Sequence, residues 1–294
     1  MMPGMNSFAL LLIVFSALMH ALWNLLVKQS RDKTIFIWWM FLCSFSLMSL
    51  FVFSSGLGLP VLTPRSLLLA LSAAVCFVLY HWFTGVAYRD GDLSMTYPLA
   101  QTSMLYVPLW GVLLLGESLS LFGIFGILLI VTGAYCIQLR SLASSEFLRP
   151  FSQLGNRSVQ AALLAGFIYS IGAIIDKTGV DEYSAYHFTY VLVFFMFSIM
   201  SLNLLRPGYR GRILEEWRQS RKLVLWSGPV MLASFLSFRY GLQLSPVSYA
   251  IPVRQVSLLI GVLIGLLFLG ESCGRIRLAS SGLILMGVVC VWHG

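Results

Sequence analysis

Long apolar runs separated by short polar breaks dominate the pattern of this chain. Runs of about 20 mostly apolar residues recur from its beginning to its end, and an α-helix of that length crosses the hydrocarbon core of a bilayer. A soluble core would instead alternate apolar stretches with polar faces. The pattern predicts an all-α integral membrane protein with ten transmembrane helices, near residues 8–27, 35–55, 66–87, 95–115, 119–138, 160–177, 186–204, 223–243, 249–268 and 276–292.

Composition agrees with this prediction. Of 294 residues, 59% are hydrophobic and 10% charged, whereas about a quarter of the residues in an ordinary soluble domain are charged. A water-soluble fold is therefore excluded. The five cysteines form no CxxC pair, so neither a metal site nor a disulfide framework is indicated, and no cofactor is expected.

The two halves of the chain repeat each other. A shift of 154 residues lays 97–103 on 251–257 and the triplet Gly-Glu-Ser of 116–118 on that of 270–272, without a gap. Shared hydrophobicity would align leucines, but it would not also align a proline, a glutamine and this triplet. We therefore expect a first repeat at 1–140 (helices one to five), a connecting loop at 141–158 and a second repeat at 159–294 (helices six to ten).

An odd number of spans in each half predicts that the second repeat enters the membrane from the opposite side, which gives two inverted five-helix repeats. Basic residues follow helices one, seven and nine, whereas the equivalent loops of the other half hold fewer bases; the loop after helix six is expected to offset Lys177 with Asp176, Asp181 and Glu182. The positive-inside rule then places both termini outside a bacterial-type cytoplasmic (inner) membrane.

Several of these residues carry a family resemblance. They are Pro98 to Gln101, the Leu-Gly-Glu ending of helix four, the Gly-containing last helix of each half, and His20-Ala21-Leu22-Trp23-Asn24 with Lys28. On these residues the chain resembles, over nearly its whole length, the EamA-type transporters of the drug/metabolite transporter superfamily. The resemblance implies ten helices around a central cavity and export of amino acids, nucleosides or other metabolites. It also implies cytoplasmic termini, as in several relatives, whereas the basic loops here place both termini outside.

Polar groups within a span are costly unless they are paired or face water, so they are the candidates for a substrate path. His20, Asn24 and Lys28 recur every four residues on one face of helix one, with Trp23 beside them. This face predicts a cavity wall. The alternative is a helix contact through Asn24 and a Lys28 side chain that extends to the interface.

Further candidates lie in other spans. Tyr80 and His81 fall deep in helix three, where an imidazole could exchange a proton or pack without a ligand. Gln101 and Gln255 occupy equivalent positions after Pro98 and Pro252, where a loosened helix exposes backbone groups. Tyr97 belongs to the same segment. The predicted substrate-binding set is His20, Trp23, Asn24, Tyr80, His81, Tyr97, Gln101, Arg239, Arg254 and Gln255.

Arg239 and Arg254 are the most informative members of this set, because uncharged Gly85 and Ala100 occupy the equivalent positions in the first half. With no acidic residue expected deep in any span, the arginines and histidines would make a central cavity neutral to positive, which suits a carboxylate, phosphate or phosphonate. The alternative is that both arginines extend to the outer interface.

Glu117 and Glu271 are paired by the repeat, but each is expected at the start of a helix, where a carboxylate can cap free amides. Capping is therefore the preferred interpretation over catalysis, and no catalytic residue is expected.

The sequence therefore predicts a secondary transporter, an exporter or exchanger, that carries a small anionic or zwitterionic metabolite such as an amino acid, organic acid or phosphonate by alternating access. Flipping of a lipid-linked sugar is an alternative within the same class; a membrane enzyme and an accessory subunit are less favoured, because no HExxH motif or facing carboxylates are present. The expected partners are the small molecule, the bilayer and a coupled proton through His20 or His81, without nucleic acid, in a monomer or homodimer.

Overall fold

The computed structural model describes residues 5–54, 58, 62–90, 96, 99–137, 139, 141, 143, 147–148, 152–204, 208–268 and 274–294, without the side chains of 89, 90, 203, 210 and 264–268. Helices account for nearly all of these residues. They are α1 (Ser7–Gln29), α2 (Lys33–Ser54), α3 (Pro64–Asp90), α5 (Ser103–Leu115), α6 (Leu121–Cys136), α8 (Arg157–Glu182), α9 (Ala185–Leu204), α10 (Tyr209–Gln243), α11 (Val247–Val253), α12 (Val256–Phe268) and α13 (Arg275–His293).

The number of apolar helices agrees with the sequence. Within the described residues, seven helices are long and apolar enough to cross a bilayer, and three shorter apolar helices, Ser103–Leu115, Leu121–Cys136 and Val247–Leu263, bring the total to ten. Large apolar side chains cover the outside, among them Phe53 at 72% exposure and Trp226 at 70%. Such a surface is stable against lipid but not against water. The prediction of a ten-helix membrane protein is confirmed.

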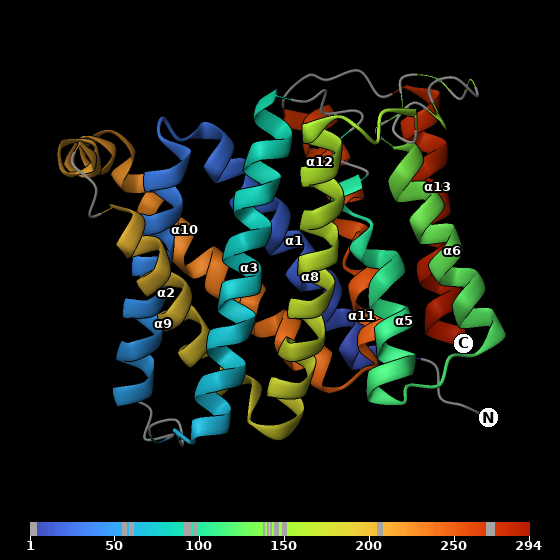
Figure 1. Ribbon diagram of the computed structural model, residues 1–294, viewed down its shortest axis with the longest axis horizontal. Coiled ribbons are helices and arrows are strands. Elements are labelled where there is room, and N and C mark those ends of the chain that lie inside the picture. The colour runs from blue at the N-terminus through green and yellow to red at the C-terminus, as the bar shows by residue number, and fades with distance from the viewer. Residues whose placement is uncertain are drawn as a thin grey trace.

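The two halves have inverted directions and matched contacts (Figure 1). α1 runs away from the end where the C-terminus lies, and α8, its counterpart under the 154-residue shift, runs towards that end. α3 packs along α8, and α1 packs along α10. Under the 154-residue shift α1 corresponds to α8 and α3 to α10, so the two contacts are equivalent in the two halves. α6 packs along α13, its own counterpart. This pairing is the pseudo-twofold relation expected of inverted repeats.

Glycines allow α6 and α13 to approach closely. A Cβ on Gly126 would lie 2.7 Å from the carbonyl oxygen of Gly287, and one on Gly133 would lie 2.7 Å from that of Ser280. The two contacts are equivalent, because the 154-residue shift relates Gly126 to Ser280 and Gly133 to Gly287. Small residues therefore take the place of hydrophobic burial, which cannot drive helix association in lipid.

Two helices, α8 and α10, extend five residues or more beyond one end of their predicted spans. α10 begins at residue 209 instead of 223, because its first turns continue beyond the apolar layer as an amphipathic helix. Trp217 of this part of α10 packs on Trp39 of α2, with ring centroids 4.8 Å apart. α8 continues to Glu182 instead of 177, and an ion pair of 2.8 Å between Lys177 and Asp181 joins its last turns. Hydropathy marks where an apolar layer ends, but a helix can continue past that point.

The ninth span is broken in the middle. α11 ends at Val253, tight turns carry the chain through Arg254 and Gln255, and α12 begins at Val256. Pro252 has no N–H to donate within this region, which favours the break. In the first half the chain likewise turns at Gln101 and Thr102 before α5 begins. These breaks bring non-helical backbone into the interior of the bundle.

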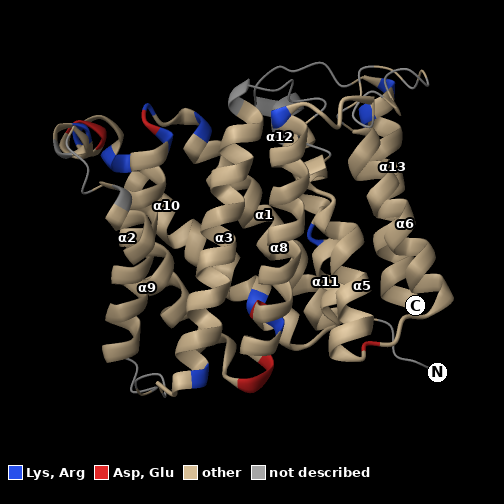
Figure 2. Ribbon diagram, in the orientation of Figure 1, with Lys and Arg blue, Asp and Glu red and all other residues tan. Residues whose placement is uncertain are grey.

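Charge is distributed unequally between the two ends (Figure 2). Lys and Arg gather at the end where α2 and α13 begin, here called the basic end. At the opposite end, the terminal end, α8 finishes with Asp181 and Glu182, and Arg65 at the start of α3 pairs with Glu182. The start of α1 and the C-terminus both lie towards this end.

Candidate functional site

A cavity of about 770 Å³ lies between the two halves. Its volume falls in the range of small-molecule sites. The lining reaches Lys33 and Arg277, which lie at the starts of α2 and α13, so the cavity extends to the basic end. Towards the terminal end it stops at Asp176, Arg239 and Leu242, where α8 packs on α10.

The structure brings the predicted binding residues together. Apart from Tyr97, which lies outside the described residues, every member of the predicted set lines the cavity: His20, Trp23, Asn24, Tyr80, His81, Gln101, Arg239, Arg254 and Gln255. They come from both repeats, on α1, α3 and α10 and at the two helix breaks. A role in substrate binding stays a prediction, but their convergence is a structural fact.

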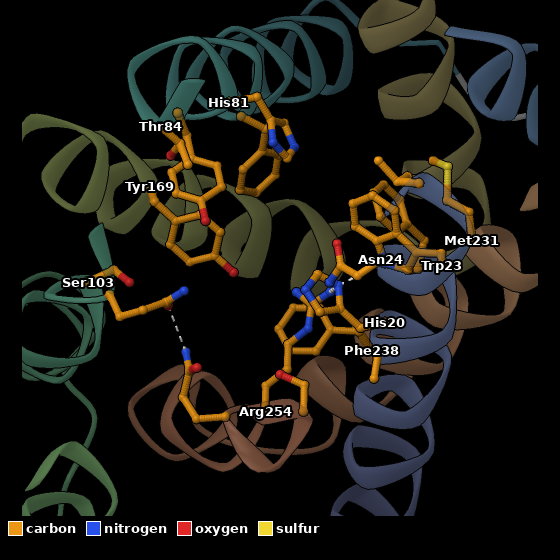
Figure 3. A pocket seen from close by; sticks show the side chains of 18 of the residues that line it. His20, Trp23, Asn24, His81, Thr84, Ser103, Tyr169, Met231, Phe238 and Arg254 are labelled. Atoms are coloured by element: carbon orange, nitrogen blue, oxygen red, sulfur yellow. Dashed lines mark hydrogen bonds between the residues drawn. The ribbon is translucent and has the colours of Figure 1, made fainter. Parts of the chain in front are cut away.

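His20 is held by two donors on the α1 side of the cavity (Figure 3). The indole Nε1 of Trp23 donates to Nδ1 of His20 at 2.9 Å, and a guanidinium nitrogen of Arg254 lies 3.4 Å from the same Nδ1. Both donors lack a lone pair to accept with, so Nδ1 must be unprotonated and the imidazole neutral. Asn24, one turn further along α1, faces the open space.

Arg254 lies at the break between α11 and α12. Its guanidinium carbon is 4.2 Å from the centroid of the Phe238 ring, a cation–π contact. Among the described residues no carboxylate pairs with it. A charged guanidinium in this position can therefore bind an anion from the cavity.

Arg239, in contrast, is neutralised. Its Nε donates to a carboxylate oxygen of Asp176 at 2.9 Å, and the two side chains are 4% and 2% exposed. The expectation that no acidic residue lies deep in a span is wrong, because α8 continues to Glu182, past Asp176, which the sequence placed at the very end of the span 160–177 among the charges of the following loop. The alternative in which Arg239 extends to the outer interface is also wrong, since it is buried against Asp176 and the Phe235 ring.

Gln101 and Gln255 bridge the two repeats. Nε2 of Gln255 donates to Oε1 of Gln101 at 3.2 Å, so each repeat contributes one partner from the same position. Beside them, the Tyr80 ring lies edge-on to Tyr169 with centroids 5.0 Å apart, and His81 lies next to Tyr80.

Sequence reasoning missed the contribution of α8. Tyr169, Ala173 and Asp176 line the cavity at i, i+4 and i+7 spacing. This spacing is visible in the sequence and was the signal that could have identified the face. A second missed wall is apolar, formed by Met40, Phe41, Phe77, Met196, Met231 and Phe235.

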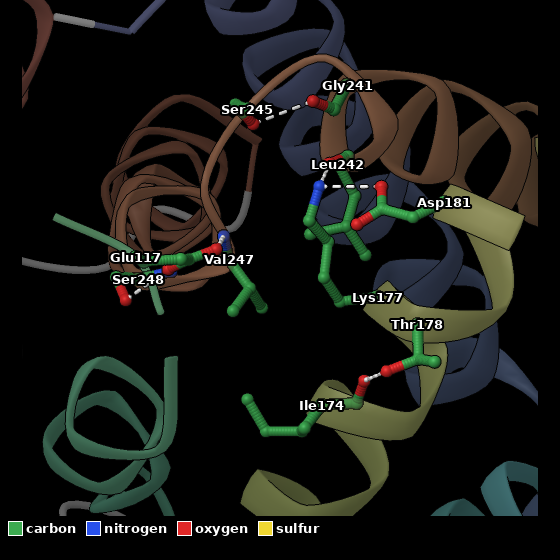
Figure 4. Close-up of polar contacts among 10 residues, drawn as sticks. All are labelled: Glu117, Ile174, Lys177, Thr178, Asp181, Gly241, Leu242, Ser245, Val247 and Ser248. Atoms are coloured by element: carbon green, nitrogen blue, oxygen red, sulfur yellow. Dashed lines mark hydrogen bonds and ion pairs between the residues drawn. The ribbon is translucent and has the colours of Figure 1, made fainter. Parts of the chain in front are cut away.

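Glu117 caps a helix, although not the one expected (Figure 4). Its Oε1 accepts from the backbone N–H of Val247 at 2.7 Å, and its Oε2 accepts from the N–H of Ser248 at 3.0 Å and from the Ser248 hydroxyl. Val247 begins α11, so a carboxylate of the first repeat caps a helix of the second. Ser120 caps α6 itself. Glu271 lies outside the described residues.

Within the described residues, no group of three His, Cys, Asp or Glu side chains could hold a metal ion.

Comparison with known proteins gives a family match in each half. A model of the EamA-like transporter family matches residues 7–139 and again residues 156–292. One crystal structure aligns with a TM-score of 0.73 over 97% of this chain and 96% of its own, at 14% identity, which shows a shared fold. No curated protein matches the chain.

Proposed function

We propose, given that the chain belongs to the EamA-like transporter family, that it is a secondary transporter whose solute is a small anion or zwitterion held by Arg254. The family consists of transporters and not enzymes. The observation that carries the proposal is a guanidinium in a central cavity with no carboxylate partner among the described residues. A charge away from bulk water is costly, and an anionic solute would offset that cost.

Alternating access is supported by a difference between equivalent contacts. α8 packs on α10 and closes the terminal end, whereas the equivalent helices α1 and α3 make at most minor contact, with the cavity between them. If the halves exchange conformations, α1 meets α3, and Leu22 and Trp23 approach Gly85 and Tyr88 at the basic end. The terminal end then opens. Cysteines placed at Trp23 and Tyr88 should cross-link only in this second state; no cross-link under any transport condition would reject the scheme.

The basic end is proposed to face the cytoplasm, which makes the state described here open to the inside. The collection of Lys and Arg at this end supports the orientation. A protease-cleavable tag after Gly294 would then be accessible from outside intact cells. Cleavage only after lysis would place the termini inside instead.

The decisive experiment for the solute is thermal stabilisation of the purified protein. Amino acids, organic acids, phosphonates, nucleosides and cationic drugs are compared, since a ligand of the native state at 100 times its Kd stabilises by about 2.7 kcal/mol. Anionic or zwitterionic compounds should stabilise the wild type and Arg218→Gln, an equal charge change at an exposed position, but not Arg254→Gln. Stabilisation by hydrophobic cations alone would overturn the proposal.

Proton coupling through His20 would depend on the solute. A proton on Nδ1 would break the bond from Trp23 and place an imidazolium beside Arg254. Such a proton is acceptable only after an anion has neutralised the guanidinium. Solute uptake into vesicles should therefore respond to an imposed pH gradient; an unchanged rate would remove the coupling but not the solute class.

A further inference from the structure

We infer that the solute carries a single anionic group on an apolar or aromatic body, and that Asp176 enforces this selectivity by cancelling the charge of Arg239. The inference rests on the proposed function and narrows it. Dianions such as dicarboxylates and phosphate esters are excluded by the same arrangement.

The charge of the inner cavity follows from its lining. The charged residues among the described lining are Lys33, Asp176, Arg239, Arg254 and Arg277. Lys33 and Arg277 lie at the starts of their helices at the basic end, where they attract anions to the mouth. Further in, Asp176 and Arg239 form a closed pair, and His20 is neutral because its Nδ1 accepts from two donors. The inner cavity therefore has a net charge of plus one, on Arg254.

One positive charge suits one negative group. Once the basic end closes around the solute, and with His20 neutral, a second negative group would have neither a cation nor bulk water, and an uncompensated charge in a low-dielectric site is strongly unfavourable. While the terminal end is closed, the buried pair does not supply a second cation, because Arg239 could leave Asp176 only by exposing an unpaired carboxylate. Asp176 is thus a specificity residue that never needs to touch the solute.

One part of the wall, formed by residues of α2, α3, α9 and α10, fits an apolar body. Phe41, Phe77, Phe235, Met196 and Met231 lie around the same space. Aromatic rings and thioethers bind apolar and aromatic groups, and methionine adapts to different shapes. A highly hydroxylated body would lose its water without gaining enough hydrogen bonds on these walls.

The experiment compares two ligands with the same body. Phenylacetate carries one carboxylate, and its para-carboxylated analogue carries two; acetate lacks the body. The wild type should bind phenylacetate at least about tenfold more tightly than either of the others, where tenfold corresponds to about 1.4 kcal/mol. Binding is measured by thermal stabilisation or calorimetry on the full-length protein.

Variants then change the charge of the cavity. Asp176→Asn releases Arg239 and raises the net charge of the inner cavity to plus two. The affinity for the dianion should therefore rise at least about tenfold, and the dianion should bind more tightly than phenylacetate. The double variant Asp176→Asn/Arg239→Gln returns the charge to plus one, and phenylacetate should again bind more tightly than the dianion. The double variant also keeps the test open if Asp176→Asn alone does not fold.

Outcomes for the two proposals differ. Equal binding of both carboxylates to the wild type, a double variant that prefers the dianion, or a folded Asp176→Asn that still prefers phenylacetate would overturn the inference while leaving an anion transporter. Failure of every anion and zwitterion to stabilise the wild type would overturn the proposed function instead.

Discussion

Glu117 joins the first repeat to α11 of the second, and its replacement gives a sharp test of that joint. The carboxylate accepts two backbone N–H groups, from Val247 at 2.7 Å and Ser248 at 3.0 Å, together with the Ser248 hydroxyl. Glu117→Gln keeps the shape but turns one oxygen into an NH₂ donor that faces these donors. A hydrogen bond to a charged group contributes about 1.5–3 kcal/mol, and an unsatisfied buried donor costs a similar amount. The expected loss of stability is about 2–4 kcal/mol.

The assay is a thermal melt of the purified protein in detergent. At about 2 °C per kcal/mol, Glu117→Gln should lower the melting temperature by roughly 4–8 °C. Glu215→Gln is the matched control, because Glu215 is 50% exposed and pairs with an exposed Arg31. Its expected effect is below about 1 kcal/mol. Equal melting temperatures for the two variants would refute the view that Glu117 holds α11 in place.

Three further predictions concern stability and use the same melts. Gly126→Ala places a methyl 2.7 Å from a carbonyl oxygen of α13 and should cost about 1–3 kcal/mol, whereas Gly282→Ala, whose Cβ meets nothing within 4 Å, should cost nothing; equal losses would refute the close contact. Ser120→Ala removes the side-chain cap of α6 and should cost about 1 kcal/mol, with Ser118→Ala as the neutral control. Arg65→Ala breaks an ion pair whose arginine is 69% exposed and should leave the melting temperature nearly unchanged; a clear drop in melting temperature would show that the pair is not screened by solvent.

The sequence predicted the spans and much of the cavity for identifiable reasons. Hydrophobic runs set the helices because lipid demands a minimum apolar length. The repeat singled out Gln101 and Gln255 before their hydrogen bond was known. Arg239 and Arg254 stood out because the other half lacks them. These predictions needed only local patterns or a comparison of the chain with itself.

The remaining features depend on contacts between distant segments. The partner of Arg239 is 63 residues away, and Asp176 was assigned to the end of a span, next to a charged loop, because a cluster of charges usually marks such an end. The two arginines therefore looked alike although one is paired and one is not. Glu117 was correctly predicted as a cap, but only the packing of α11 against the end of α5 shows which helix it caps. The extension of α8 and α10 past the apolar layer could not be predicted from hydropathy either.

The hydrogen bond between Gln101 and Gln255 has a consequence for motion. In the proposed cycle the two halves exchange conformations, and this exchange maps the pair onto itself, so the bond can persist in both states as a pivot. The Asp176–Arg239 pair has no such twin, because Leu22 and Gly85 occupy the equivalent positions. Closure of the terminal end is thus secured by an ion pair that closure of the basic end lacks. In the proposed alternating-access cycle, the resting population of the empty carrier should therefore be weighted towards the state with the terminal end closed, and binding of the solute should supply the difference in free energy.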